Sequence, residues 1–194
     1  MTDQATDEAL MAQVQAGDHQ AFSELVRRHT QKFFNLAFRS LHNEADAQDV
    51  VQACFLKLWQ KPQSYNSDQK AKFTTWFYRV VLNACEDLRR KNKVRAYQDI
   101  DEMADMYGAE GSQESDMVVN EENIALEKAI SDLPDRQKDA LNLVVYQEMK
   151  QKDAADTMGL GVKALESLLS RAKKTLRDRM VKQKKEEGPA YATR

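Results

Sequence analysis

The sequence is poor in residues that interrupt helices and in residues that build disulfide or metal frameworks. Its 194 residues include six glycines and three prolines, which is too few for a turn-rich all-β chain or a collagen-like chain. The two cysteines, Cys54 and Cys85, exclude a disulfide framework and a four-cysteine zinc site. The composition therefore favours a helical protein of a reducing compartment.

Long apolar runs are also missing. No stretch approaches the roughly 18 apolar residues that a membrane-spanning helix needs, and the N-terminus, with Asp3, Asp7 and Glu8, lacks the basic start of a signal peptide. We therefore expect a soluble cytoplasmic protein without membrane insertion. The length allows one domain or two small ones and excludes a large multidomain enzyme.

Charge divides the chain into three segments. Residues 1–97 carry 14 basic and 11 acidic side chains, residues 98–123 carry no basic and nine acidic ones, and residues 124–194 carry 15 and 11. The net charge reaches +6 over residues 61–95 and +7 over residues 150–185. One basic run is often only a solvated helix face, but two runs on separate modules favour a polyanionic partner.

The acidic middle segment contains two glycines and two serines and has little apolar periodicity, which is typical of a flexible linker. We therefore predict an all-α protein with two small helical domains, residues 1–97 and 124–181. A flexible acidic linker, 98–123, joins them, and a basic, disordered tail, 182–194, follows.

Apolar residues at helical spacing predict three helices over roughly 7–16, 18–40 and 43–61. Asp18 and Asn43 are suited to the N-caps of the second and third. A fourth helix is expected from Trp76 to about Arg90, capped by Thr74 or Thr75.

The fourth helix carries two neighbouring stripes. One is apolar, and the other repeats at three or four and consists of Trp76, Arg79, Asn83, Asp87 and Arg90. Four aromatic residues crowd its start, namely Phe73, Trp76, Phe77 and Tyr78. An aromatic beside a basic groove holds unpaired bases by stacking and charge. At least two of the four aromatics are expected in the core.

The C-terminal segment fits a helix-turn-helix. A helix over 123–131 and another ending near Met149, with Val144 and Val145 turned inward, precede the sequence QKDAADTMGLGVKALESLLS. Ala155 stands four residues before Gly159, where alanine permits a close helix crossing and glycine a left-handed turn. The second helix then presents a polar face suited to the major groove, followed by a basic flank that fits phosphates.

The two segments together resemble an extracytoplasmic-function (ECF) sigma factor, of group IV, of bacterial RNA polymerase. The resemblance covers about Asp7 to Met180. It rests, in this order, on GDHQAFSELVRRH, DAQDVVQACFLKLW, FTTWFYRVVLNACEDLRR, LPDRQKDALNLVVY and ALESLLSRAKKTLRDRM. It implies a promoter-melting domain and a domain that reads the minus-35 element, both bound to the β and β′ subunits of core polymerase.

The resemblance also implies three sets of site residues. The core-binding set is Asp46, Asp49, Gln52, Phe55, Leu56 and Trp59, although Trp59 is alternatively a core residue. The minus-10 set is Lys70, Lys72, Phe73, Trp76, Arg79, Asn83, Asp87, Arg89 and Arg90. The minus-35 set is Lys152, Lys163, Glu166, Ser167, Ser170, Arg171 and Lys174.

Two positions depart from the family pattern, because Gln48 and Ala53 stand where acidic residues are usual. Either core affinity is weaker than typical or other contacts compensate. The acidic linker resembles the connector that threads through the polymerase, or it only solubilises the chain. The resemblance further implies an anti-sigma factor released in a stress response.

Alternative functions remain open at this point. A stand-alone helix-turn-helix regulator would bind an operator without polymerase, and an adaptor that titrates an inhibitor would never bind core. An enzyme is the least favoured class, because the three histidines lack metal-ligand spacing and neither a Gly-rich phosphate loop nor a nucleophile motif is present. We expect no cofactor and no metal.

Overall fold

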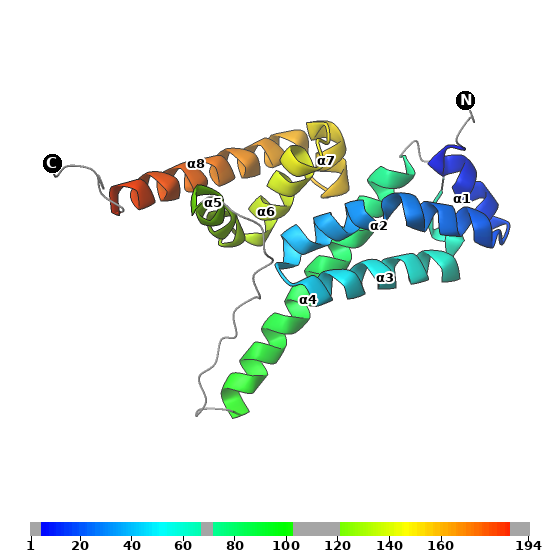
Figure 1. The fold of residues 1–194 in the computed structure, drawn as a ribbon, viewed down its shortest axis with the longest axis horizontal. Helices are drawn as coiled ribbons and strands as arrows, with labels where there is room; N and C mark the ends of the chain where they lie inside the picture. Colours follow the sequence, from blue (N-terminus) through cyan, green and yellow to red (C-terminus); the bar gives the residue numbers. More distant parts are fainter. Residues whose placement is uncertain (1–4, 67–71, 103–120, 187–194) are drawn as a thin grey trace. The chain divides into compact units, whose positions relative to one another are not determined.

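All regular elements are helical in the part of the chain that the structure describes, residues 5–66, 72–102 and 121–186 (Figure 1). The structure is a computed structural model. The chain divides into two compact units, Met1–Ser112 and Gln113–Arg194. The predicted all-α class is confirmed. Most of the predicted acidic linker lies outside the described residues, so its character stays a prediction.

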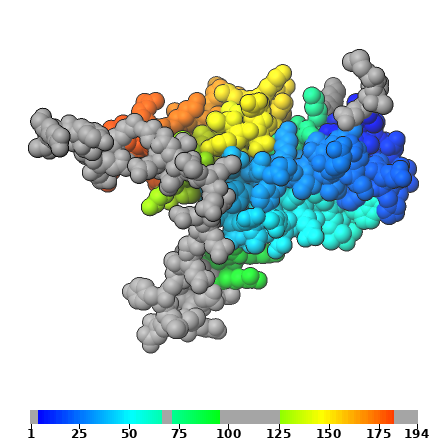
Figure 2. Space-filling view, in the orientation of Figure 1, coloured from blue at the N-terminus to red at the C-terminus, as the bar shows by residue number. Residues whose placement is uncertain are grey.

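The first unit contains helices α1 (Asp7–Gln15), α2 (His19–Leu41), α3 (Glu44–Gln60) and α4 (Phe73–Glu102), with a short 3-10 turn, η1 (Pro62–Ser64), after α3. Helices α2 and α3 pack side by side, and both contact α4. In the space-filling view the blue side chains of α1 and α2 lie directly against the cyan side chains of α3 (Figure 2).

Local caps explain where the first helices begin. Asp18 Oδ1 accepts the N–H of Gln20 at 2.7 Å and that of Ala21 at 3.1 Å, and Asn43 Oδ1 accepts the N–H of Asp46 at 2.9 Å. Both residues satisfy N–H groups that lack partners within the helix. The predicted N-caps at 18 and 43 are therefore confirmed.

The core of the first unit is a cluster of aromatic rings. Phe33 and Phe77 are fully buried, and their ring centroids lie 4.7 Å apart. Phe73 stacks on Phe77 at 5.4 Å, and Tyr78 meets Phe33 edge-on at 5.2 Å. Three of the four aromatics at the start of α4 are thus core residues, as expected for at least two of them, and Trp76 alone is partly exposed.

The predicted ends of α4 are wrong at both sides. The helix begins at Phe73 rather than Trp76, so Thr74 and Thr75 stand in its first turn and do not cap it. The N–H of Phe73 is instead accepted by Glu8 Oε1, at 3.1 Å, from α1. At its far end α4 continues to Glu102, past Arg90 and into the first residues of the predicted linker.

The second unit consists of α5 (Glu121–Ser131), α6 (Asp135–Leu141), the π-helical turn η3 (Asn142–Tyr146), α7 (Gln151–Thr157) and α8 (Val162–Glu186). Helices α5, α6 and α7 all pack on α8. The core between α5, α6 and α8 includes Ile130, Leu133, Leu141 and Ala172. Helix α8 reaches Glu186, so residues 182–186, placed in a disordered tail, are helical.

Two further expectations in the second unit need correction. The helix predicted to end near Met149 ends at Leu141 and passes into the π-helical turn. Val145, expected to face inward, is 51% exposed. The wider turn changes the helical phase, so periodicity counted at 3.6 residues misplaces side chains beyond it.

The helix-turn-helix prediction is confirmed in its geometry. Gly159 has a φ of +64°, a left-handed conformation that glycine adopts without steric cost. Ala154, Ala155 and Leu165 are fully buried where α7 packs on α8. Small residues at this crossing let the two helices approach closely.

Candidate functional surfaces

One face of α4 combines a partly buried ring with exposed polar side chains. We call it the α4 stripe, and it consists of Trp76, Arg79, Asn83, Asp87 and Arg90. All but Trp76 are exposed. Arg90 Nη2 lies 2.8 Å from Asp87 Oδ1, an ion pair at the open surface. The stripe is therefore accessible to a partner along four turns of the helix.

The Trp76 ring lies against the aromatic core. Its centroid is 5.3 Å from that of Tyr65, 5.8 Å from that of Phe77 and 6.1 Å from that of Phe73. These rings support one part of the indole, while the remainder is exposed. A ring held in this way offers a fixed surface for stacking a base.

Two members of the predicted minus-10 set do not belong to this surface. Phe73 is fully buried under the core rings, so it cannot touch DNA in this conformation. Arg89 is half-buried and donates from Nη1 to Ser40 Oγ at 2.6 Å and Ser40 O at 3.2 Å, which ties α4 to α2. Lys72 is exposed, and Lys70 lies outside the described residues.

The outer face of α3 carries the predicted core-binding set. Asp49 and Gln52 are exposed, Asp46 is half-buried, and Leu56 is 54% exposed. Leu56 also lines the apolar groove between α2 and α3, so it belongs to a continuous apolar surface, which is typical of an interaction site. Phe55 is only 6% exposed, so it supports this face more than it forms it.

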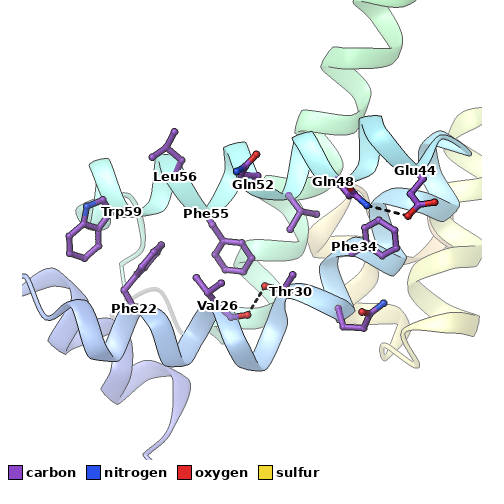
Figure 3. Close-up of a pocket in the computed structure, with 12 residues that line it drawn as sticks. Phe22, Val26, Thr30, Phe34, Glu44, Gln48, Gln52, Phe55, Leu56 and Trp59 are labelled. Carbon is purple, nitrogen blue, oxygen red and sulfur yellow. Dashed lines mark hydrogen bonds between the residues drawn. The ribbon is translucent and has the colours of Figure 1, made fainter.

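A groove of about 770 Å³ runs between α2 and α3 next to this face (Figure 3). The ring of Trp59 lies 5.0 Å from that of Phe22 and 4.4 Å from that of His19, which closes one end. The lining is mostly apolar and comprises Phe22, Val26, Thr30, Gln31, Phe34, Glu44, Gln48, Val51, Gln52, Phe55, Leu56 and Trp59. Trp59 is half-buried, so part of its ring packs in the first unit and part lines the groove, and its role in binding core polymerase stays a prediction.

The α2 side of this groove was not anticipated from the sequence. Phe22 and Val26 on α2 are half-buried and line the groove. Phe34 stacks on Phe38 at 6.0 Å, and Phe38 is 42% exposed. Their spacing of four, off the buried stripe of α2, is the signal that could have identified a second apolar face.

The second helix of the helix-turn-helix presents a polar face to solvent. We call it the α8 face, and it consists of Lys163, Glu166, Ser167, Ser170, Arg171 and Lys174, all exposed. Lys152 on α7 is exposed as well. The opposite side of α8 is buried through Leu165, Leu169 and Ala172. The structure thus brings the predicted minus-35 set onto one helix face, with Lys152 on the preceding helix.

Arg171 lies folded along its own helix. Its Nη2 donates to Ser167 Oγ at 3.1 Å, and its Nε donates to Ser167 O at 3.3 Å. Both bonds are exposed to water, so the net free energy needed to release the guanidinium is small. The side chain is therefore available to a ligand at the cost of two weak contacts.

Within the residues that the structure describes, no group of three His, Cys, Asp or Glu side chains is placed to hold a metal. Burial raises the pKa of the Cys54 thiol to about 11, so this residue packs as a neutral side chain at neutral pH. None of the helices in the described ranges is long and apolar enough to cross a membrane.

Both units match models of a known protein family. The model described as Sigma-70 region 2 matches residues 25–95, and the one described as Sigma-70, region 4 matches residues 123–176. RNA polymerase sigma factor NccH of Alcaligenes xylosoxydans xylosoxydans is 30% identical over 180 residues, which are 91% of this chain and 95% of NccH. ECF RNA polymerase sigma factor SigW of Bacillus subtilis (strain 168) is 28% identical over 87% of this chain and 93% of SigW.

A solved structure has a similar helical fold. The structure of CnrH in complex with the cytosolic domain of CnrY matches with a TM-score of 0.64 and 25% sequence identity. The match covers 89% of this chain and 95% of CnrH. The similarity therefore extends over both helical units.

Proposed function

Because the chain belongs to the ECF group of RNA polymerase sigma factors, we propose that it directs core polymerase to promoters through three surfaces of its own. They are the α4 stripe, the α8 face and the outer face of α3. The chain acts as an initiation factor in the cytoplasm, and RNA synthesis itself is the work of the core enzyme. One observation carries the proposal: an exposed polar stripe that starts at a half-buried indole and a helix-turn-helix with an exposed polar face occupy separate units of one chain.

The α4 stripe is the reader of the melted minus-10 strand. Extruding a base costs a few kcal/mol of lost stacking, and stacking on an aromatic side chain returns about 1 to 3 kcal/mol per base. Trp76 supplies the ring, Asn83 supplies hydrogen bonds to a base edge, and Arg79 and Arg90 neutralise phosphates. Asp87 pairs with Arg90 at 2.8 Å, and because the pair is exposed to water it yields to a phosphate at little cost.

The α8 face is the reader of the minus-35 duplex. A helix with one buried and one polar side fits the major groove, where base pairs present distinct hydrogen-bonding patterns. Glu166 is suited to accept a bond from a cytosine amine. Lys152, Lys163 and Lys174 fix the register through phosphates.

The outer face of α3 binds core polymerase. Asp46 and Asp49 provide negative charge, and Leu56 and the adjacent groove provide apolar surface, which suits a basic and partly apolar partner. Gln48 donates from Nε2 to Glu44 Oε1 at 3.2 Å. The groove is the added contact that offsets the acidic residues absent at 48 and 53.

The direct test of the function is transcription in vitro. Purified chain and core polymerase are incubated with sheared genomic DNA of the source cell, and the 5′ ends of the transcripts are sequenced. We expect starts downstream of two shared elements at a fixed spacing. Transcripts no different from those of core alone would contradict the proposal.

The core-binding assignment has its own test. Replacing Asp46 and Asp49 together with lysine reverses the charge of the α3 face, so core affinity is expected to fall while the helical content is kept. Glu86→Lys combined with Glu127→Lys is the matched control, since both are exposed glutamates outside the three surfaces. Equal core affinity of the two double variants would refute the assignment.

A regulatory partner is the last part of the proposal. The structural neighbour CnrH was solved with the cytosolic domain of a second protein, CnrY. We extend this to the present chain as an anti-sigma factor that covers its polymerase-binding or DNA-binding surfaces. Pull-down of core polymerase in the presence of a co-purified inhibitor tests it, because the inhibitor and core should compete.

A further inference from the structure

Helix α1 belongs to none of the three surfaces, yet its side chains bind the chain immediately before and at the start of α4. Gln15 Nε2 donates to Pro62 O at 3.2 Å and to Tyr65 O at 2.8 Å. Glu8 Oε1 accepts the N–H of Phe73 at 3.1 Å. Helix α1 thus holds one residue, Tyr65, on one side of residues 67–71 and another, Phe73, on the other side.

The two residues held by α1 are those whose rings flank Trp76. The Tyr65 ring lies 5.3 Å from the Trp76 ring, the Phe73 ring lies 6.1 Å from it, and the Tyr65 and Phe73 rings meet edge-on at 5.7 Å. Trp76 also donates its backbone N–H to Lys72 O at 3.1 Å, in the first turn of α4. The position of the indole therefore depends on where Tyr65 and Phe73 are fixed.

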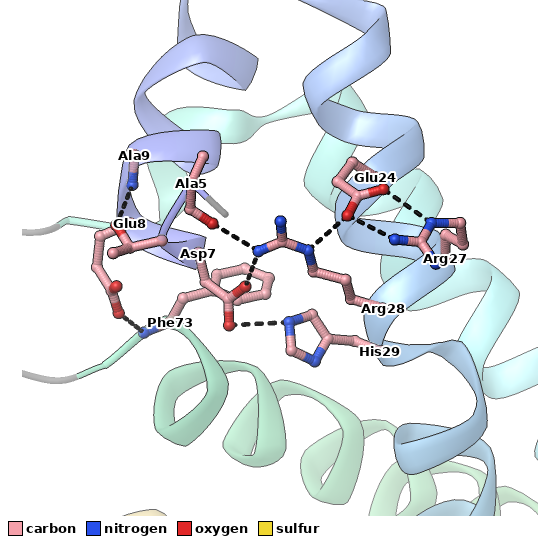
Figure 4. A network of polar contacts seen from close by, with 10 residues as sticks. Ala5, Asp7, Glu8, Ala9, Glu24, Arg27, Arg28, His29 and Phe73 are labelled. Atoms are coloured by element: carbon pink, nitrogen blue, oxygen red, sulfur yellow. Dashed lines mark hydrogen bonds and ion pairs between the residues drawn. The ribbon is translucent and has the colours of Figure 1, made fainter. Parts of the chain in front are cut away.

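Helix α1 is itself firmly attached to the first unit. Leu10, Met11 and Val14 are almost completely buried. At its start Asp7 Oδ2 lies 2.9 Å from His29 Nε2, and Asp7 Oδ1 lies 3.4 Å from Arg28 Nη1 (Figure 4). Figure 4 shows Asp7 and Glu8 reaching to different helices, Asp7 to α2 and Glu8 to the start of α4.

The chemistry of Glu8 suits this role. The first N–H groups of a helix lack partners within it, and a carboxylate near them is favoured by the helix dipole. Burial raises the pKa of Tyr65, and the negative charges of Glu8 and Asp7 raise it further. The phenol that packs on Trp76 therefore stays neutral at physiological pH.

We propose that α1 is a positioning element of the single-strand reader, in which Glu8 and Gln15 hold Phe73 and Tyr65 so that Trp76 presents its exposed edge in one orientation. The proposal rests on the function proposed for the α4 stripe. Neither residue touches DNA, and both act through the rings that flank the indole. Loss of their hydrogen bonds leaves Trp76 in place but less well oriented.

The first measurement needs no DNA and follows Trp76 directly. The chain has two tryptophans, Trp59 and Trp76, so in a Trp59→Phe parent Trp76 is the only indole. Glu8→Met and Gln15→Met remove the polar atoms at similar side-chain size, whereas Glu8→Gln keeps an acceptor oxygen. We expect a larger fast component of Trp76 fluorescence anisotropy decay in the two Met variants and the parental decay in Glu8→Gln.

The second measurement uses the full chain with native Trp59, bound to core polymerase on a promoter identified by transcript sequencing. Open-complex formation by the Glu8→Met/Gln15→Met double variant is expected to fall about three- to tenfold, in the range of a net hydrogen-bond contribution. Core affinity and the minus-35 footprint stay at the wild-type level, and Glu8→Gln restores opening. If the double variant does not fold, Gln15→Met alone is used, and open-complex formation is expected to fall in the same direction.

The results separate this inference from the function on which it rests. Unchanged Trp76 anisotropy in the Met variants overturns the inference, and so does normal opening by the Met variants when Trp76→Ala opens poorly. Normal opening by Trp76→Ala contradicts the proposed function of the stripe itself. A parallel loss of opening, core binding and minus-35 footprint would assign α1 a purely structural role, which also overturns the inference.

Discussion

The two helices proposed to face DNA are supported in different ways. The α4 stripe begins on a ring packed against Tyr65, Phe73 and Phe77, and the same helix is tied to α2 by Arg89. The α8 face stands on small or aliphatic residues, among them Ala155 and Ala172, and the guanidinium of Arg171 contacts only its own helix in the bonds described.

This difference matches the form of DNA that each surface is proposed to recognise. A single strand has no fixed shape, so its reader must supply a rigid platform on which a base can stack. A duplex is already ordered, so its reader needs only a protruding helix whose side chains adapt to the groove. We therefore expect substitutions under the α4 stripe to act through geometry, and substitutions on the α8 face to act one contact at a time.

The largest expected effect concerns the buried crossing of α7 and α8. Ala155 is fully buried at the helix crossing, and inserting a larger side chain there typically costs about 1 to 3 kcal/mol, occasionally more. Ala155→Leu should weaken minus-35 binding by forcing α7 and α8 apart and lowering the stability of the second unit, whereas core binding through α3 persists. Thermal unfolding and core pull-down measure the two effects, and the exposed Ala164→Leu serves as the stability control.

Loss of core binding in Ala155→Leu would show that the two units do not fold independently. In that case the α4 stripe and the α8 face would depend on one cooperative core, and their different packing could not be compared as two independent supports.

The next effect concerns the Trp76 ring of the α4 stripe. Trp76→Ala removes the stacking surface, so opening of the minus-10 region in the polymerase complex should fall about 5- to 150-fold, as expected for about 1 to 3 kcal/mol. Permanganate reactivity of the melted thymines measures it. Val94→Ala, at an exposed residue of the same helix, is the control and should open normally.

A smaller and more local effect is expected on the α8 face. Arg171→Ala should weaken binding to the native minus-35 element by about 1 to 3 kcal/mol relative to a scrambled one, measured by competition in the polymerase complex. Lys173→Ala, an exposed neighbour outside the α8 face, is the control. If Arg171→Ala instead weakens binding equally on native and scrambled elements, and lowers the slope of log affinity against log salt concentration by about one, Arg171 contacts a phosphate.

The smallest effect tests the outer attachment of α1. Hydrogen bonds from Arg27 and Arg28 lower the pKa of Glu24 to about 2, and Arg28 also pairs with Asp7. Because the folded pKa lies below the usual 4.5, the stabilisation is present above about pH 4.5 and is lost as the pH falls towards 2.

Glu24→Gln should therefore lower the thermal midpoint slightly at pH 7, and its difference from wild type should shrink between pH 4.5 and 2. Glu86→Gln, at an exposed glutamate on α4, is the control. The assignment is wrong if the difference between Glu24→Gln and wild type does not change over this range.

The sequence predicts those features whose cause lies within a few residues. Asp18 and Asn43 cap the helices that follow them, and Ala155 and Gly159 identify the helix-turn-helix, because each acts through neighbours in the chain. The alternation of faces on α4 also follows from helical spacing alone. These local signals are sufficient to predict that the residues of the α4 stripe share one helix and those of the α8 face another.

The errors arise where the determining partner is distant in sequence. Glu8 caps α4 from 65 positions away, so the start of that helix could not be read from Thr74 or Thr75. Phe73 and Arg89 have the residue types of a DNA-binding surface, but the ring of Phe73 packs near His29 of α2 and Arg89 binds Ser40 of α2. The groove between α2 and α3 likewise exists only once both helices are paired.

The most direct test of the account compares the chain with and without core polymerase on one promoter. Footprinting should show protection of the minus-35 element, and permanganate-reactive thymines in the minus-10 element, only when the chain and core polymerase are both present. Strong, sequence-specific protection of duplex DNA by the chain alone, without melting and without any gain on adding core, would contradict it.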